Sequence, residues 1–477
     1  QAPPQTTNDV EIISRSKLDL NELILQAPLV GVMTGDAGRV SVVIGVLGGR
    51  IPSLTLLARS RIIGALVASL SLKQIGETIR QSMEKLLLDL FLSTTGNDLV
   101  DLKRLVDTGG IGQDLMAACS TLAKSSLHWS LVGALYDHFR EEAGKLKQKI
   151  THVLSDIDMT VWVGTFGAGG PKFPKGPVPG ALTLYELLGR RTTFLSARPP
   201  IWESRTRGAL LNDIGIAEAT LLQGTLENVV KYVYDKEAAH KGMGEQKEKV
   251  FKQFACLHPD ARFVFFGDSG EGDVDFALAF ISDNAVVYPP DHQYEQCPDR
   301  LAFIHDVVMS DGIETKTSAA QRESLRVRGV HIFDTYLGAA KQLFLYGLFD
   351  QNDLQCAAER IVEEFAQIPL EEYKSIEVFN ARQEELNRDL EAVNTMLGIP
   401  GFLEAAQELL PQTSPYDSSS TNGYPSDSAN LSVTSDPSLS LQSYPSPYPE
   451  SKEFDRNNST QLQTLKSGES SDSDDEP

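Results

Sequence analysis

Two aspartates and a threonine stand at alternate positions in the middle of the chain, directly after a short apolar run. Val153 and Leu154 close the run, and Asp156, Asp158 and Thr160 follow. The run is typical of a buried strand, and open α/β sheets bind ligands just beyond the carboxyl ends of their strands. Two carboxylates and a hydroxyl at such a point predict chemistry on a phosphate, with a hard cation close by.

The two aspartates suit the two roles that phosphoryl transfer through an aspartyl-phosphate requires. The nucleophile must be ionised, as an ordinary aspartate is at neutral pH, and it forms the covalent intermediate; this role fits Asp156. A second carboxyl must protonate the leaving oxygen and later take a proton from water. Asp158 lies two residues further on, where a turn out of the strand can bring it to the leaving group. We therefore predict these two residues as the catalytic pair.

Attack of one anion on another needs a cation between them, and Mg²⁺ fits a set of ligands made only of oxygens. Asp156, the backbone carbonyl of Asp158 and Asp268 are the predicted ligands, with Asp273 in the outer shell. These carboxylates follow two different predicted strands, so the site depends on those strands lying side by side.

Hydroxyl and ammonium groups can bind the oxygens of the transferring phosphate and spread their charge. Thr160, Ser196 and Lys247 are the predicted phosphate-binding residues. Lys249 and Lys252 stand close to Lys247 in the same predicted helix, so the choice of lysine stays open.

Each signal also has an ordinary structural explanation. An Asp-x-Asp-x-Thr triplet is often a turn or a cap, a lone serine often caps a helix, and a lysine in a charged helix usually faces solvent. The Gly-Asp-Ser-Gly run at 267–270 resembles the nucleophile loop of trypsin-like proteases, but Glu271 follows it instead of glycine, within an α/β pattern. The ordered set is far more specific than its members.

The elements that must position these groups alternate along the chain. Apolar runs typical of strands occur at 151–154, 192–195, 220–222, 262–266 and 302–308. Helical patterns lie between them, at 182–188, at 201–211 and from about 245. This alternation predicts an α/β fold with a mostly parallel, Rossmannoid sheet and helices on both faces.

Two spacings bear on the substrate. Residues 161–180 are dense in Gly and Pro, carry Lys172 and Lys175, and predict a mobile flap. Ser196 to Lys247 leaves room for a helix, a strand and a helix, but not for a separate cap domain. An uncapped site stays open to bulky substrates such as a lipid headgroup or a phosphoprotein.

The chain before the first strand divides into two predicted parts. Residues 1–73 are unassigned: the start is polar and partly disordered. Residues 28–72 allow three predictions: a few strands leading into a helix, a segment on a membrane surface, or a buried part of the fold. We favour the buried part. Their uncharged runs are too short to span a bilayer. Residues 74–149 have a helical period and predict a helical module without chemistry of its own.

Residues 150–345 form the predicted catalytic domain, and 346–410 a helical extension. We expect the apolar face of this extension to pack on its own domain rather than on a partner; it comprises Leu386, Leu390, Val393 and Leu397. Residues 411–477 are rich in Ser, Pro and Asp and predict a disordered acidic tail. A solvating tail is favoured over one that recruits protein partners.

The composition narrows the functional class. A net charge of −22 argues against general nucleic-acid binding, which recruits Lys and Arg. Four cysteines without paired spacing argue against a zinc site or a disulfide framework, and fit a reducing compartment. No signal peptide is visible, and a first residue of Gln1 indicates a trimmed or incomplete chain. We expect a cytoplasmic protein, with peripheral contact to membranes as an option.

The ordered motifs resemble the haloacid dehalogenase (HAD) superfamily of phosphohydrolases and, more narrowly, the catalytic domain of the actin-patch-type phosphatidate phosphatases. The segments that carry the resemblance lie between about 75 and 345: Leu-Ser-Asp-Ile-Asp-Met-Thr (154–160), Phe-Leu-Ser-Ala-Arg-Pro (194–199), Lys247 before Pro259, and Phe-Phe-Gly-Asp-Ser-Gly-Glu-Gly-Asp (265–273). Shorter matches are Leu-Ser-Thr-Thr-Gly-Asn-Asp-Leu (92–99), Phe-Ile-His-Asp-Val (303–307) and Phe-Asp-Thr-Tyr (333–336).

This resemblance implies the nucleophile, acid/base, phosphate-binding and metal roles stated above, on the matching residues. One departure stands at Met159, where the family usually has Asp. Three hypotheses follow. The first is a Mg²⁺-dependent phosphatase that acts on phosphatidate. The second is a phosphoprotein or small phosphomonoester phosphatase, and the third is a catalytically silent, lipid-binding scaffold of the same fold.

Overall fold

The computed structural model of the chain describes residues 19–402 apart from short segments. These segments are 73–74, 109–113, 124–127, 164–175, 190, 199–201, 213, 217–219, 224–235, 271, 283–297, 307–316, 374 and 400–401. The predicted disorder at the start of the chain and in the tail at 411–477 falls outside the described residues. The domain boundaries proposed above stay predictions.

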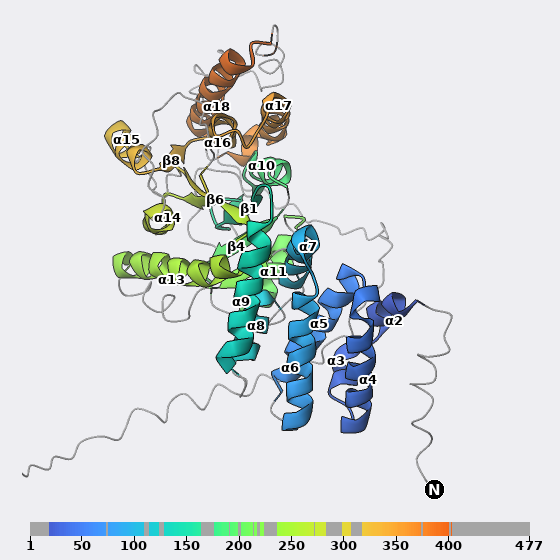
Figure 1. Ribbon diagram of the computed structural model, residues 1–477. Helices are drawn as coiled ribbons and strands as arrows, with labels where there is room; N and C mark the ends of the chain where they lie inside the picture. The colour runs from blue at the N-terminus through green and yellow to red at the C-terminus, as the bar shows by residue number, and fades with distance from the viewer. Residues whose placement is uncertain are drawn as a thin grey trace, which may run out of the picture. The chain divides into compact units, whose positions relative to one another are not determined.

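A six-stranded, fully parallel sheet lies at the centre of the α/β part (Figure 1). Its order is β5-β4-β1-β6-β7-β8. The strands are β1 (Ile150–Ser155), β4 (Thr192–Ser196), β5 (Thr220–Gln223), β6 (Ala261–Asp268), β7 (Arg300–His305) and β8 (Val330–Phe333). The five predicted strands are present, although residues 307 and 308 of the predicted strand at 302–308 lie outside the described residues, and β8 is an addition. The order reverses between β1 and β6, where sheets of this kind bind ligands.

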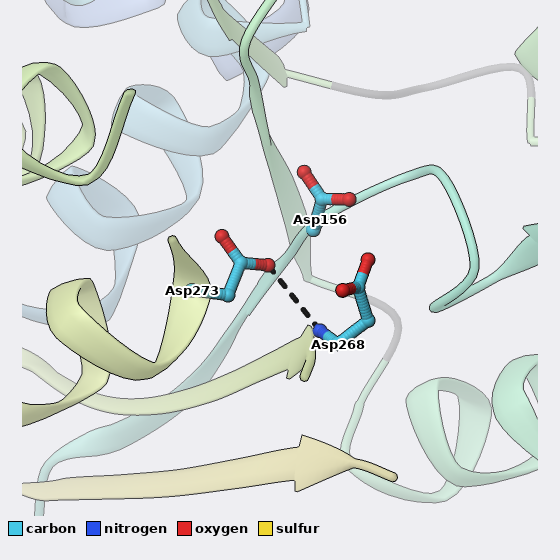
Figure 2. Close-up of side chains that lie close together, drawn as sticks. All are labelled: Asp156, Asp268 and Asp273. Atoms are coloured by element: carbon cyan, nitrogen blue, oxygen red, sulfur yellow. Dashed lines mark hydrogen bonds between the residues drawn. The ribbon is translucent and has the colours of Figure 1, made fainter. Parts of the chain in front are cut away.

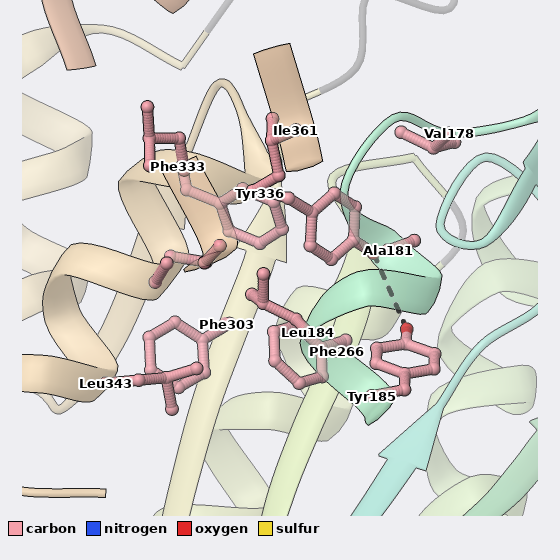
Figure 3. Close-up of a cluster of buried hydrophobic side chains, with 14 of the residues drawn as sticks. Val178, Ala181, Leu184, Tyr185, Phe266, Phe303, Phe333, Tyr336, Leu343 and Ile361 are labelled. Atoms are coloured by element: carbon pink, nitrogen blue, oxygen red, sulfur yellow. Dashed lines mark hydrogen bonds between the residues drawn. The ribbon is translucent and has the colours of Figure 1, made fainter. Parts of the chain in front are cut away.

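Helices cover both faces of the sheet, as predicted. They are α10 (Ala181–Leu187), α11 (Glu203–Asn212), α13 (Lys236–Leu257), α14 (Asp273–Ser282), α15 (Ala319–Val327), α16 (Tyr336–Leu345), α17 (Gln351–Ala366) and α18 (Ile376–Leu397). Successive strand residues point to opposite faces. Val153 of β1 therefore lies in one hydrophobic cluster with residues of α10 and α16–α18, whereas its neighbour Leu154 lies in a second cluster with residues of α13 and α14. Figure 3 shows part of the first cluster, including Ala181 and Leu184 of α10 and Leu343 of α16.

The helical extension packs on the sheet domain. Leu386, Leu390, Val393 and Leu397 of α18 are all buried in the same hydrophobic cluster as Val153. The expectation that this face packs on its own domain is thereby confirmed.

A short hairpin follows β1. Its strands, β2 (Trp162–Val163) and β3 (Gly176–Pro177), are antiparallel. They bound the predicted flap, whose residues 164–175, with Lys172 and Lys175, lie outside the described residues.

Eight helices precede β1 in the described part of the chain. They are α2 (Leu20–Gln26), α3 (Leu29–Met33), α4 (Ala37–Arg50), α5 (Leu56–Leu70), α6 (Glu77–Leu92), α7 (Gly96–Asp107), α8 (Leu115–Ala123) and α9 (His128–Gly144). One hydrophobic cluster joins them, from Ile24 to Phe139. The alternative of strands at 28–72 is wrong, because this stretch is helical; the favoured alternative, burial in the fold, holds best for α5, most of whose residues are buried. No described helix combines the length and apolar character needed to cross a bilayer.

A buried ion pair joins the helical part to the sheet. The Nζ atom of Lys103 in α7 donates to the carboxylate of Asp260, just before β6, and at 3.0 Å to the carbonyl of Leu257. Lys103 and Asp260 are 1% and 3% exposed. Leu257, the last residue of α13, packs in the hydrophobic cluster of the helical part. The carboxylate of Asp260 therefore depends on a cation supplied by a distant segment of the chain.

Candidate active site

Three buried carboxylates converge at the point where the strand order reverses (Figure 2). Asp156 directly follows β1, Asp268 ends β6, and Asp273 begins α14. Each offers an oxygen within 4.8 Å of the other two. The backbone N–H of Asp156 donates to the carbonyl of Phe266 at 2.9 Å, which fixes the end of β1 against β6. The register of two parallel strands therefore brings Asp156 and Asp268 together.

Asp273 enters this group because residue 267 has no side chain. A Cβ atom at Gly267 would lie 2.5 Å from Oδ2 of Asp273 and 2.7 Å from the ring of Phe265, closer than real contacts allow. The Oδ2 atom of Asp273 accepts a hydrogen bond from the backbone N–H of Asp268 at 3.3 Å. The glycine of the 265–273 segment thus makes room for the third carboxylate.

Lys247 of α13 is the lysine that reaches the carboxylates. It is buried, and its Nζ atom donates to Oδ1 of Asp156 at 2.8 Å and to Oδ1 of Asp273. Lys249 is exposed, and Lys252 pairs with Glu248 at 2.6 Å. Burial lowers the pKa of Lys247, but Asp156 and Asp273 outweigh burial and raise that pKa overall. The ammonium therefore stays charged at neutral pH.

The charge of this group fits a divalent cation. With all three carboxylates ionised, they and the one ammonium leave two negative charges in a buried site. Burial raises the pKa of Asp156 to about 7; the Lys247 ammonium opposes this rise, and Asp273 and Asp158 add to it. The Oδ2 atom of Asp156 is buried and forms no hydrogen bond within the described residues. Buried polar atoms normally have a partner. An oxygen-coordinated cation such as Mg²⁺ would provide that partner and balance the charge.

Asp158 lies outside the three-carboxylate group and faces a different partner. Its side chain is 32% exposed, and both of its oxygens accept from Nη2 of Arg198, at 2.7 and 2.6 Å. Arg198 itself is 8% exposed and stands two residues past the end of β4, the other neighbour of β1. Sequence reasoning missed Arg198 as a site residue. The available signal was a basic residue at the same strand end as Ser196.

The two predicted phosphate-binding hydroxyls are both buried. Ser196 ends β4, and its Oγ atom accepts from the backbone N–H of Arg198 at 3.2 Å. The Oγ1 atom of Thr160 forms no hydrogen bond within the described residues. A ligand oxygen could therefore become a partner of Thr160, whereas Ser196 already receives one donor.

Two residues missed by sequence reasoning hold the loop after β1. The hydroxyl of Tyr336 donates to the carbonyl of Thr160 at 2.9 Å, and Nδ1 of His305 lies 3.0 Å from the carbonyl of Met159. The backbone of Met159 is in the left-handed region, with a φ of 58°, which few non-glycine residues adopt. Its side chain packs with Val161 and Val163. Met159 therefore belongs to the apolar packing around the hairpin.

If Asp158 is the acid/base residue predicted from the sequence, Arg198→Gln should impair proton transfer, because Asp158 would lose the group that orients it. General acid catalysis matters for a poor leaving group and little for a good one, and contributes about 10²–10⁴-fold. The kcat for glycerol phosphate should therefore fall by about 10²-fold, and that for nitrophenyl phosphate by only a few-fold. Arg205→Gln, an exposed position on α11, is the matched control. Equal losses with both esters would contradict this role.

Comparison with known proteins assigns neither a family nor a function to the chain. No protein-family model matches the chain, and no curated protein or solved structure matches it significantly. The interpretation of this site therefore rests on its geometry and chemistry.

Proposed function

We propose that the protein is a Mg²⁺-dependent phosphatase of the haloacid dehalogenase type that works through an aspartyl-phosphate on Asp156. The observation that carries this proposal is the buried group of Asp156, Asp268 and Asp273 around Lys247, with Asp158 held by Arg198 at the next strand end. Three buried carboxylates share one ammonium, and because unbalanced buried charge is costly, the group favours a bound cation.

The residues would act in two steps. In the first, a carboxylate oxygen of Asp156 bonds to phosphorus while the ester P–O bond breaks, and Asp158 gives its proton to the leaving oxygen. In the second, a water oxygen bonds to phosphorus, the Asp156–phosphorus bond breaks, and Asp158 takes the proton from water. Thr160 and Ser196 would bind the phosphate oxygens.

Lys247 would both position the carboxylates and bind the phosphate in this scheme. Its contacts with Asp156 and Asp273 hold both carboxylates, and its charge offsets that of the phosphate. Asp156 and Asp268 would hold Mg²⁺, together with the backbone carbonyl of Asp158, and Asp273, which accepts from Lys247 and from the backbone N–H of Asp268, would support these ligands from the outer shell. The cation, when bound, would neutralise charge between the nucleophile and the phosphate.

The proposed substrate is phosphatidate, which would yield diacylglycerol and phosphate. Between Ser196 and Lys247 the described residues form α11, β5 and α13, and no separate cap domain is present among them. A site without a cap can accept a phosphate ester at a lipid surface. A phosphoprotein or a small phosphomonoester would also fit such a site, so the substrate must be measured.

Phosphate release from phosphatidate vesicles, compared with a soluble aryl phosphate, tests the proposal. We expect turnover of phosphatidate to be preferred, to vanish with EDTA and to return with Mg²⁺. Preference for the soluble ester would favour the second class of phosphatase. Activity that survives chelation would overturn the metal assignment, and the absence of activity on both esters would favour a silent scaffold.

A further inference from the structure

The helix α4 buries only one of its two faces. Val40, Ile44 and Leu47 recur at four- and three-residue steps and pack into the core of the helical part. The opposite face carries Val42 and Val46, which are 46% and 41% exposed. Solvent-facing helix surfaces are normally charged or polar. The outer face of α4 is apolar instead.

The two charged residues within α4 are both basic, and the acidic residue beside them is Asp36, the N-cap, whose carboxylate accepts from the backbone N–H groups of Gly38 and Arg39. Arg39 and Arg50 lie at the two ends of α4, and the helix contains no acidic residue. Each residue advances the helix by about 100°, so Arg39 and Arg50 lie about 40° and 60° around the helix axis from the midpoint of Val42 and Val46. Arg50 is exposed. The valines are therefore bordered by positive charge.

This basic character extends along the sequence and contrasts with the rest of the chain. Residues 37–76 contain no Asp or Glu, and carry Arg39, Arg50, Arg59, Arg61 and Lys73. At the average of 65 acids in 477 residues, forty residues would hold about five. Arg59 is buried and bonded to Thr94, so it does not contribute to the surface, whereas Arg61 is exposed. A chain with an overall charge of −22 thus contains a forty-residue stretch without an acidic residue, between Asp36 and Glu77.

We propose that the outer face of α4 docks on the surface of an anionic lipid bilayer. Val42 and Val46 would enter the interface between headgroups and acyl chains, and the exposed Arg50 would meet the anionic headgroups. With 14 residues, α4 is about 21 Å long, so it would lie in the interface and not span the bilayer. The absence of acids within α4 favours such a surface, since an acidic side chain there would be repelled, and the carboxylate of Asp36 beside it is bound to the helix N-terminus.

Two other occupants fit less well. A protein partner is usually held by aromatic anchors, and α4 has none. A second copy paired through the same face would repeat each contact, so that the arginines of both copies would lie near one another. This proposal does not rest on the proposed enzymatic function.

Flotation of the full chain with vesicles of phosphatidylcholine and phosphatidylglycerol in a seven-to-three ratio tests the proposal. Phosphatidylglycerol is a phosphodiester, so its binding is independent of turnover at a phosphomonoesterase site. We expect binding to these vesicles at low salt and little binding to pure phosphatidylcholine. Val46→Asp should weaken binding at least tenfold, and Arg50→Gln about fivefold, as the loss of roughly 1 kcal/mol per basic residue implies.

Val327→Asp on α15 is the matched control, because it introduces the same charge at a valine that is also 41% exposed. It should bind vesicles as the wild type does. Absence of wild-type binding, or equal binding by Val46→Asp, would overturn the proposal, as would equal weakening by Val327→Asp. A dimer in sedimentation that Val46→Asp converts to a monomer would assign the face to a second copy. Unchanged turnover of a soluble aryl phosphate by Val46→Asp keeps this test separate from that of the active site.

Discussion

Asp156→Asn should lower kcat for every phosphate ester by about 10⁴-fold or more, because an amide cannot form the covalent acyl phosphate. The substitution keeps the size of the side chain. Lys247 retains its contact with Asp273, so the fold and the position of the lysine should persist. Wild-type protein quenched during turnover should carry phosphate that hydroxylamine releases, and the variant should carry none.

Asp275→Asn controls for the loss of one negative charge near the site. Asp275 lies in the first turn of α14, two residues after Asp273, and is exposed. We expect its kcat to remain close to that of the wild type. Activity of Asp156→Asn within tenfold of the wild type would exclude Asp156 as the nucleophile. A similar loss in both variants would point to a general charge effect.

Lys103→Met should reduce the free energy of unfolding by about 3–5 kcal/mol, because removal of one partner leaves a buried charge without compensation. Asp260 is 3% exposed and would lose its contact with the Lys103 ammonium. Burial lowers the pKa of Lys103, and Asp260 opposes that effect. Methionine has a similar length, so the hydrophobic contacts of α7 should largely remain. Urea unfolding followed by circular dichroism and by fluorescence would measure the change and test two-state behaviour.

Two variants sharpen this prediction. Lys252→Met on α13 removes an exposed lysine that pairs with Glu248, and should change the free energy of unfolding by no more than about 1 kcal/mol. Lys103→Met combined with Asp260→Leu should regain much of the loss, since replacing both partners of a buried pair by apolar groups is often tolerated. A double variant less stable than Lys103→Met would contradict the explanation that the unpaired charge of Asp260 causes the loss.

Local patterns predicted most of the α/β part. Apolar runs bounded by polar residues located five strands, because strands of a buried parallel sheet are apolar on both faces. The strand β8 was missed: only Val330–Phe333 form it, and such a short run has no distinct period. The stretch 28–72 was left open because its Val and Ile content also suits strands. Packing against other helices decided in favour of helix, a tertiary effect that overrides weak local preference.

By itself, the sequence determined which chemical groups stand at successive strand ends: Asp156, Asp158, Ser196, Asp268 and Asp273. Their positions follow from a local pattern, in which each apolar run is followed directly by polar residues. The tertiary structure alone decided which groups meet. It selected Lys247 over Lys249 and Lys252, because a shift along a helix turns a side chain away from the site by about 100° per residue. It also paired Arg198 with Asp158, because β4 and β6 flank β1 and three distant segments share one edge of the sheet.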